Sequence, residues 1–221
     1  MILDFFFPAV CPVCEAEILQ YHSHSCLKDL LALRLDVKKR CRVCFHPLEN
    51  GECPFCNSRP VFFDEHLSLF PLTDEWRKVL HSWKFANDRG IYKIFLEEMK
   101  SLKFADGVDR ILYIRSGRSQ MKYRNYQPCR DLSRFLAKEK HVTYGGDIRK
   151  RKTGTQSKRN VIDRYLSVQN AFLCSLKTNF KHVLLVEDVF TTGATVNEVS
   201  RILKQRGSNK VSVLSMLMRE I

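Results

Sequence analysis

The clearest pattern of apolar and polar positions lies near the C-terminus. Residues 183–186 are an apolar run, typical of a strand that is buried on both faces of a sheet, and residues 211–217 supply the next strand. Between them, apolar residues at positions 196–203 recur with helical spacing, and Gly207 follows as a helix stop. The order strand, helix, strand predicts a βαβ unit in an open α/β sheet.

The middle of the chain predicts further elements of the same kind. Residues 65–71 and 111–114 have the character of strands. From Trp76, apolar residues recur at i, i+3, i+4 and i+7, which predicts an amphipathic helix, and residues 91–102 predict another. Pro128 is expected to open a further helix. The pattern as a whole predicts an α/β fold in which helices flank a parallel sheet.

Several polar residues mark the ends and faces of these helices. Thr73 or Asp74 is expected to cap the helix that contains Trp76. Lys84 lies at the end of that helix, just before a turn, and is singled out for this position. After Pro128, basic residues follow at four-residue spacing, which places them on one helix face. These are Arg130, Arg134 and Lys138.

Length and composition limit the class of protein. The chain has 221 residues, of which 44% are hydrophobic, so it can bury a core and is not a disordered chain. No apolar run reaches the ~18 residues of a membrane-spanning helix. The first ten residues lack a basic leader and a small-residue cleavage site. We therefore expect a cytoplasmic protein.

The net charge of +13 is concentrated in one part of the chain. Residues 115–160 contain 14 Lys and Arg against three acids, a net charge of +11. Residues 149–160 contain almost no apolar side chain, which predicts a mobile loop. Such a block indicates a surface that faces phosphates. The basic side chains that we expect to contact nucleic acid are Arg118, Lys122, Arg124, Arg149, Lys150, Arg151, Lys152, Lys158 and Arg159.

Cysteines are concentrated as strongly, with seven of nine within residues 1–56. In the cytosol they would be reduced, so the clustering indicates metal binding rather than disulfides. Two Cys-x2-Cys pairs are separated by eight residues with a glycine turn, which lets four thiolates converge on a tetrahedral Zn2+. The four are Cys41, Cys44, Cys53 and Cys56. A closed site of four thiolates serves folding, not catalysis.

A second set, Cys11, Cys14 and Cys26, supplies only three ligands. The fourth could be His22, His24 or a cysteine of the other set, and the sequence leaves this open, together with the number of zinc ions. A redox role for the Cys-x2-Cys pairs is the alternative, but that role expects a pair that opens a helix in a βαβ context. We therefore predict a small N-terminal zinc module over residues 1–60, followed by a domain over residues 61–221.

The residues between the first strand and the helix of the βαβ unit are candidates for ligand binding. Glu187 and Asp188 lie at the carboxyl end of the strand at 183–186, where open α/β sheets bind ligands. Next comes a hydroxyl-rich turn with a glycine, at the start of a helix, which offers amides and the positive helix end to a phosphate. Its residues are Thr191, Thr192, Gly193, Ala194 and Thr195. A ribose and a phosphate side by side are thus the expected ligand, and the P-loop sequence Gly-Lys-Ser/Thr is absent.

A second turn has a weaker anion-binding pattern. Arg115, Ser116 and Gly117 follow the buried strand at 111–114, and their backbone amides could hold an anion. Tyr113, Tyr123 and Tyr126 interleave with the basic residues and could stack on bases or belong to the core.

The stretch VLLVEDVFTTGAT closely resembles the phosphoribosyl-diphosphate (PRPP) motif of type I phosphoribosyltransferases. With the N-terminal cysteine pairs, the WKF segment, the basic middle and the stretch from Thr153 to Gln156, nearly the whole chain resembles the ComF family of competence proteins. The resemblance implies a zinc-binding region before a phosphoribosyltransferase-like domain. It also implies a role in natural transformation, in which the protein handles incoming single-stranded DNA beside a helicase partner.

The resemblance also implies roles for the residues of the motif. Glu187 and Asp188 would contact the ribose hydroxyls, and residues 191–195 would hold the 5′-phosphate. Residues 115–118 would lie at the diphosphate loop, with Mg2+ accompanying PRPP, and residues 149–159 would correspond to the flexible loop. The chain departs from the family at Tyr123–Gln127, where the usual Arg-Gly-Phe-Asn-Gln stretch has lost its glycine.

Two functions fit these features. The first is a DNA-handling protein that also binds PRPP or a nucleotide, which accounts for both the basic block and the zinc module. The second is an active phosphoribosyltransferase, whose basic residues would neutralise the diphosphate leaving group. Diphosphate needs only a few cations, so 14 basic residues favour the first. The acceptor base of any transfer is not evident from the sequence.

Overall fold

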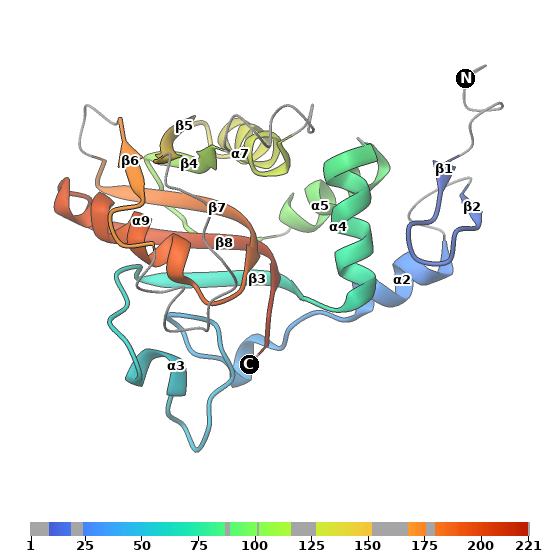
Figure 1. The fold of residues 1–221 in the computed structure, drawn as a ribbon, viewed down its shortest axis with the longest axis horizontal. Coiled ribbons are helices and arrows are strands. Elements are labelled where there is room, and N and C mark those ends of the chain that lie inside the picture. The colour runs from blue at the N-terminus through green and yellow to red at the C-terminus, as the bar shows by residue number, and fades with distance from the viewer. Residues whose placement is uncertain are drawn as a thin grey trace.

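A six-stranded sheet forms the centre of the computed structural model, which describes residues 9–18, 24–86, 89–100, 102–115, 127–151, 168–175 and 180–220 (Figure 1). The strands are β3 (Glu65–Pro71), β4 (Arg110–Arg115), β5 (Thr143–Lys150), β6 (Phe172–Cys174), β7 (His182–Phe190) and β8 (Lys210–Met218). Their order is β3-β8-β7-β4-β5-β6, and every neighbouring pair is parallel except β5 with β6. The expected α/β fold with a parallel sheet is confirmed.

Helices cover both faces of the sheet. They are α4 (Asp74–Ala86), α5 (Arg89–Lys100), α7 (Pro128–Glu139) and α9 (Ala194–Gln205). Successive residues of β7 point to opposite faces of the sheet. Leu184 and Val186 pack in one core with α4, α5 and α7, whereas Val183 and Leu185 pack in a second core with α9. The central strands are therefore buried on both faces, as their apolar runs predict.

The predicted helix ends are also found. Thr73 caps α4, because its side-chain oxygen accepts a hydrogen bond of 3.2 Å from the amide of Trp76. Pro128 is the first residue of α7. Within the described ranges, no helix has both the length and the apolar character needed to cross a bilayer.

The prediction of a loop from residue 149 is wrong at its start. Arg149 and Lys150 are the last residues of β5, in register with Leu173 and Phe172 of β6, and the amide of Arg151 donates to the carbonyl of Ala171 at 2.7 Å. Hydrogen bonds to the neighbouring strands hold this backbone, while the side chains of all three residues stay exposed. Residues 152–160 lie outside the described residues.

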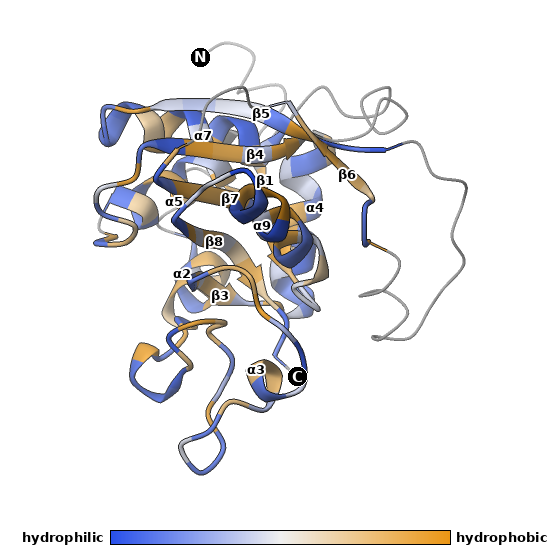
Figure 2. Cartoon of the chain, turned by 90° about the vertical axis from the view of Figure 1, so that its left-hand side faces the viewer, coloured by the Kyte–Doolittle hydropathy of each residue, from blue (hydrophilic) through white to orange (hydrophobic). Residues whose placement is uncertain are grey.

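The N-terminal residues add short elements: β1 (Ala9–Val10), β2 (Glu17–Ile18), α2 (Ser25–Ala32), the 3-10 helix η2 (Val37–Lys39) and α3 (Pro54–Asn57). They join two different cores. Cys11 and Leu27 pack with the α4 and α5 layer, whereas Phe45 and Phe55 pack with the α9 layer. Figure 2 shows α3 and its flanking loops beyond β3, at the edge of the sheet. The domain boundary near residue 60 stays a prediction.

Candidate sugar-phosphate site and cysteine groups

The turn of residues 191–195, called the 191–195 turn below, joins β7 to α9. Gly193 lies at its centre with φ of 66°, in the left-handed region that favours glycine, and as the N-cap residue it has no side chain to cap α9. Thr192 Oγ1 accepts a hydrogen bond of 3.4 Å from the amide of Ala194, the first residue of the helix. The helix therefore begins with backbone amides and its positive dipole end available to an anion. A small pocket opens here, lined by Glu187, Val189, Phe190, Thr191, Thr192, Gly193, Ala194, Thr195 and Val196.

Glu187 and Asp188, the acidic pair, lie on β7 itself, just before this turn. One oxygen of Asp188 accepts a hydrogen bond of 2.8 Å from the amide of Val189, and the other forms an ion pair with Lys84 of α4. Lys84 was singled out in the sequence for its position alone. Its pairing with the acidic pair is found only in the structure, because it joins two segments that lie far apart in the chain.

The two carboxyls have opposite pKa shifts. Burial, and then the charge of Asp188, raises the pKa of Glu187 well above its ordinary value. Burial also acts to raise the pKa of Asp188, but the charge and hydrogen bond of Lys84 outweigh it and bring that pKa below its usual value. The Oε2 atom of Glu187 is buried and has no hydrogen-bond partner within the described ranges. The pair thus combines a carboxyl whose pKa is raised with one whose pKa is lowered, and both can form hydrogen bonds with the hydroxyls of a sugar.

Glu187→Gln is expected to raise stability at neutral pH. Folded Glu187 keeps its proton at pH values where the unfolded chain, with a carboxyl pKa of 4.5, has lost it, so wild-type stability falls as pH rises above that value. Glutamine cannot titrate. Melting temperatures at about pH 5 and about pH 7.5 measure the effect, and the advantage of the variant should grow toward the higher pH. An advantage that does not change with pH would contradict the raised pKa.

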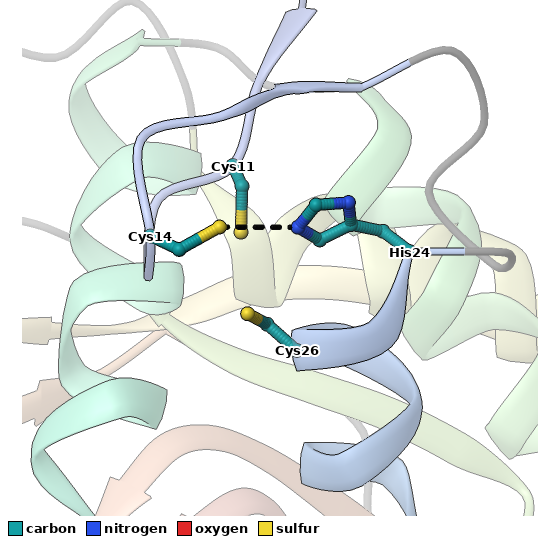
Figure 3. A group of neighbouring side chains, drawn as sticks. All are labelled: Cys11, Cys14, His24 and Cys26. Atoms are coloured by element: carbon teal, nitrogen blue, oxygen red, sulfur yellow. Dashed lines mark hydrogen bonds between the residues drawn. The ribbon is translucent and has the colours of Figure 1, made fainter.

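The first cysteine group consists of Cys11, Cys14, His24 and Cys26, whose ligand atoms all lie within 4.8 Å of one another. Figure 3 shows the side chains converging from the β1–β2 loop and the start of α2. Cys14 Sγ lies 3.2 Å from His24 Nε2. Hydrogen bonds from the Ala16 amide and from His24 lower the pKa of Cys14 to about 6, which favours a thiolate. Of the three possible fourth ligands, the structure brings in His24, while His22 lies outside the described residues.

The second cysteine group consists of Cys41, Cys44, Cys53 and Cys56, again within 4.8 Å. Two sulfur pairs are 3.8 Å and 3.2 Å apart, close to the about 3.8 Å between thiolates on a tetrahedral Zn2+. Burial raises the pKa of Cys44, and it raises that of Cys56 to about 12, so a metal ion would displace protons on binding. All these cysteines are free. Each group could bind a metal such as zinc, so the described part of the chain contains two candidate sites.

The second predicted anion site is only partly described. Arg115 ends β4 and is in register with Arg149 of β5. Tyr113 is in register with Val186, so the end of β4 lies beside the acidic pair on the same sheet edge. Tyr113 itself is buried, so it belongs to the core rather than to a stacking surface. The remaining predicted contacts lie outside the described residues: Ser116, Gly117, Arg118, Lys122, Tyr123, Arg124, Tyr126, Lys152, Lys158 and Arg159.

A groove between α5 and α7, called the α5–α7 groove below, was not predicted. Its apolar lining includes the aromatic residues Tyr92, Phe135 and Tyr144. Three cations, Lys93, Arg134 and Lys138, also line it. All three are exposed, and no ion pair is found for them among the described residues. In the sequence, the basic residues at four-residue spacing after Pro128 indicated one side of this groove. The structure adds Tyr92 of α5 and Tyr144 of β5.

Comparison with known proteins agrees with this architecture. The phosphoribosyl transferase domain family matches residues 127–218. The DNA utilization protein YhgH of Escherichia coli K12 is 25% identical over 221 residues, 93% of this chain and 95% of that protein. Competence protein ComFC of Streptococcus pneumoniae is 24% identical over 216 residues, 86% of this chain and 92% of that protein.

Two further similarities cover less of the chain. Competence protein F of Haemophilus influenzae is 33% identical over 95 residues, 41% of this chain and 42% of that protein. Among solved structures, the orotate phosphoribosyltransferase of Aeropyrum pernix is 14% identical, with a TM-score of 0.37, and covers 66% of this chain and 71% of its own.

Proposed function

The chain belongs to the ComF family of competence proteins, with a phosphoribosyltransferase-like domain, and from this premise we propose that it binds incoming single-stranded DNA during natural transformation and also binds PRPP. It would act in the cytoplasm, with a competence helicase as partner. Zinc would fill both cysteine groups and stabilise the N-terminal residues. The PRPP part rests on one observation: α9 begins at Gly193, an N-cap residue without a side chain, a few residues after the acidic pair.

At this site each group would have a distinct task. The amides of residues 191–195 and the positive end of α9 would bind the 5′-phosphate. Asp188 would accept a hydrogen bond from one ribose hydroxyl. A second ribose hydroxyl would be the hydrogen-bond partner that the buried Oε2 atom of Glu187 lacks. Lys84 offsets the charge of Asp188, so that the acidic pair does not repel an anionic ligand.

Mg2+ would enter with PRPP rather than on a protein cage. Lys84 already pairs with Asp188, and the raised pKa of Glu187 disfavours its ionised form. The groups of potential metal ligands found in the described part of the chain are the two cysteine groups, and neither offers the carboxylate oxygens that Mg2+ prefers. When bound with PRPP, Mg2+ would neutralise the diphosphate.

The α5–α7 groove supports the DNA part of the proposal. Single strands bind where aromatic rings stack on bases beside cations that contact the phosphates. Tyr92, Phe135 and Tyr144 line the groove with three exposed cations that are not used in ion pairs. Arg149 and Lys150, exposed at the end of β5, would extend the positive surface. The proposal also includes DNA contacts by Arg118, Lys122, Arg124 and the basic residues of 151–159.

Calorimetry with PRPP and with a single-stranded oligonucleotide, separately and together, tests both parts. Arg134→Glu combined with Lys138→Glu is expected to weaken oligonucleotide binding at least about tenfold and to lower its salt slope by about 1–2, while PRPP binding is unchanged. The control, Lys28→Glu with Lys78→Glu, makes the same change in net charge on exposed residues outside the groove.

Three outcomes would revise the proposal. Equal losses in both double variants would remove the groove from the DNA role. Unchanged PRPP affinity in Asp188→Ala would remove Asp188 from the ribose role. Release of diphosphate on addition of a nucleobase would favour the second function, an active phosphoribosyltransferase.

A further inference from the structure

The segment between Cys53 and Cys56 of the second cysteine group packs against the 191–195 turn through Phe55. Phe55, between Cys53 and Cys56 on α3, is buried with 6% of its surface exposed. A Cβ atom on Gly193 would lie 3.1 Å from Phe55 Cζ and 2.5 Å from Phe190 Cζ. The Phe55 ring also stacks on His46 at 4.3 Å, within the same group of loops. The floor of the turn is therefore a side chain held between two cysteines of the group.

Two further connections join the loops around the second cysteine group to the residues that flank the 191–195 turn. His66 donates from Nδ1 to the carbonyl of Cys44 at 2.9 Å, and its ring stacks on Phe190 at 4.1 Å. Asn197, in the first turn of α9, accepts a hydrogen bond of 2.7 Å from the amide of Phe62 and donates one of 3.1 Å to the carbonyl of Pro60. Packing and hydrogen bonds thus link the cysteine loops to both ends of the turn.

We propose that Phe55 is a positioning residue for the 191–195 turn, and that metal in the second cysteine group thereby controls binding at the sugar-phosphate site. This inference rests on the proposed binding of PRPP and adds its regulation. Without metal, the loop that carries Phe55 loses the coordination bonds that fix it, so the floor of the turn is lost. With metal, the amides of residues 191–195 stay in the arrangement that a phosphate requires.

Phe55→Leu in the full-length, zinc-loaded protein tests the positioning role. Leucine keeps the site apolar but removes the ring from beneath the turn, so PRPP affinity should fall about tenfold, about 1.4 kcal/mol. Zinc content, measured by mass spectrometry, should equal that of the wild type. Phe45→Leu is the matched control, because Phe45 is also buried, with 3% of its surface exposed, between Cys44 and His46, and none of its atoms is among those nearest Gly193. Its PRPP affinity should stay within about twofold of the wild type.

Wild-type protein provides a second measurement, which does not depend on the folding of any variant. If metal favours PRPP binding, PRPP must favour metal binding by the same factor. Saturating PRPP should therefore raise the chelator concentration that removes zinc from the second group, whereas inorganic diphosphate at the same concentration should not. The measurement is made in a Cys14→Ser background, in which the first cysteine group lacks a ligand, so that the zinc released comes from the intact second group.

The failures are distinguishable. If the wild type does not bind PRPP, the proposed function fails and this inference fails with it. If the wild type binds PRPP, but Phe55→Leu behaves like Phe45→Leu and PRPP does not change zinc retention, the inference alone is overturned.

Discussion

A Cys44→Ser variant is expected to lose one zinc ion per chain and to melt at least about 10 °C below the wild type. Cys44 is fully buried, and its sulfur lies 3.2 Å from that of Cys53. Serine cannot replace a thiolate on zinc. Zinc contributes roughly 10–16 kcal/mol to small cysteine sites, as much as the about 5–15 kcal/mol that stabilise a typical domain.

This loss should spread beyond the cysteine loops. Phe45, Phe55 and Phe63 belong to the same core as Val199 and Leu203 of α9. If the loops detach, this core becomes exposed to water. We therefore expect exposed apolar surface, measured by dye binding, to rise together with the loss of zinc.

Two matched variants show whether the effect belongs to this site. Cys174→Ser changes a half-buried cysteine of β6 that is in neither cysteine group, and it should keep full zinc content. Cys14→Ser changes an exposed ligand of the first group, so it should lose the other zinc ion with a smaller fall in melting temperature. Full zinc content in Cys44→Ser, or equal destabilisation in all three variants, would contradict the assignment.

The sequence predicted those parts of the fold in which a local pattern matches the local structure. β4, β7 and β8 are mostly apolar because both faces of the sheet are covered, so that their residues alternate between two cores. β5 was missed, since its sequence TYGGDIRK is polar and contains two glycines. Hydrogen bonds to β4 and β6 make it a strand, and such pairing comes from segments that are distant in the chain.

The same distinction applies to the site. The acidic pair, the 191–195 turn and the second cysteine group each form one short motif, so spacing was enough to find them. Spacing could not choose between His22 and His24, because both precede Cys26 by a few residues. It also could not pair Lys84 with Asp188 or place Phe55 under Gly193, since these contacts depend on how α4 and α3 pack against the end of β7.

Gly193→Ala is expected to lower the free energy of unfolding by about 2–5 kcal/mol and to weaken PRPP binding at least about a hundredfold. Alanine at a φ of 66° costs about 1–2 kcal/mol, because its Cβ approaches the following carbonyl. The same Cβ would lie 2.5 Å from Phe190 Cζ, a distance that real contacts do not show, and relief of such overpacking costs about 1–3 kcal/mol more.

Gly107→Ala separates these two causes. Gly107 has a φ of 72°, close to that of Gly193, but a Cβ there meets nothing within 4 Å. Gly107→Ala should therefore show the backbone cost alone, about 1–2 kcal/mol, with PRPP affinity unchanged. Chemical denaturation and calorimetry on both variants measure the difference. Equal destabilisation would mean that the Phe190 and Phe55 rings move aside at no cost, in which case the turn would not depend on the floor beneath it. The predicted loss of affinity follows only if that floor is rigid, because the turn must then move away from the rings and carry its amides out of line with the phosphate.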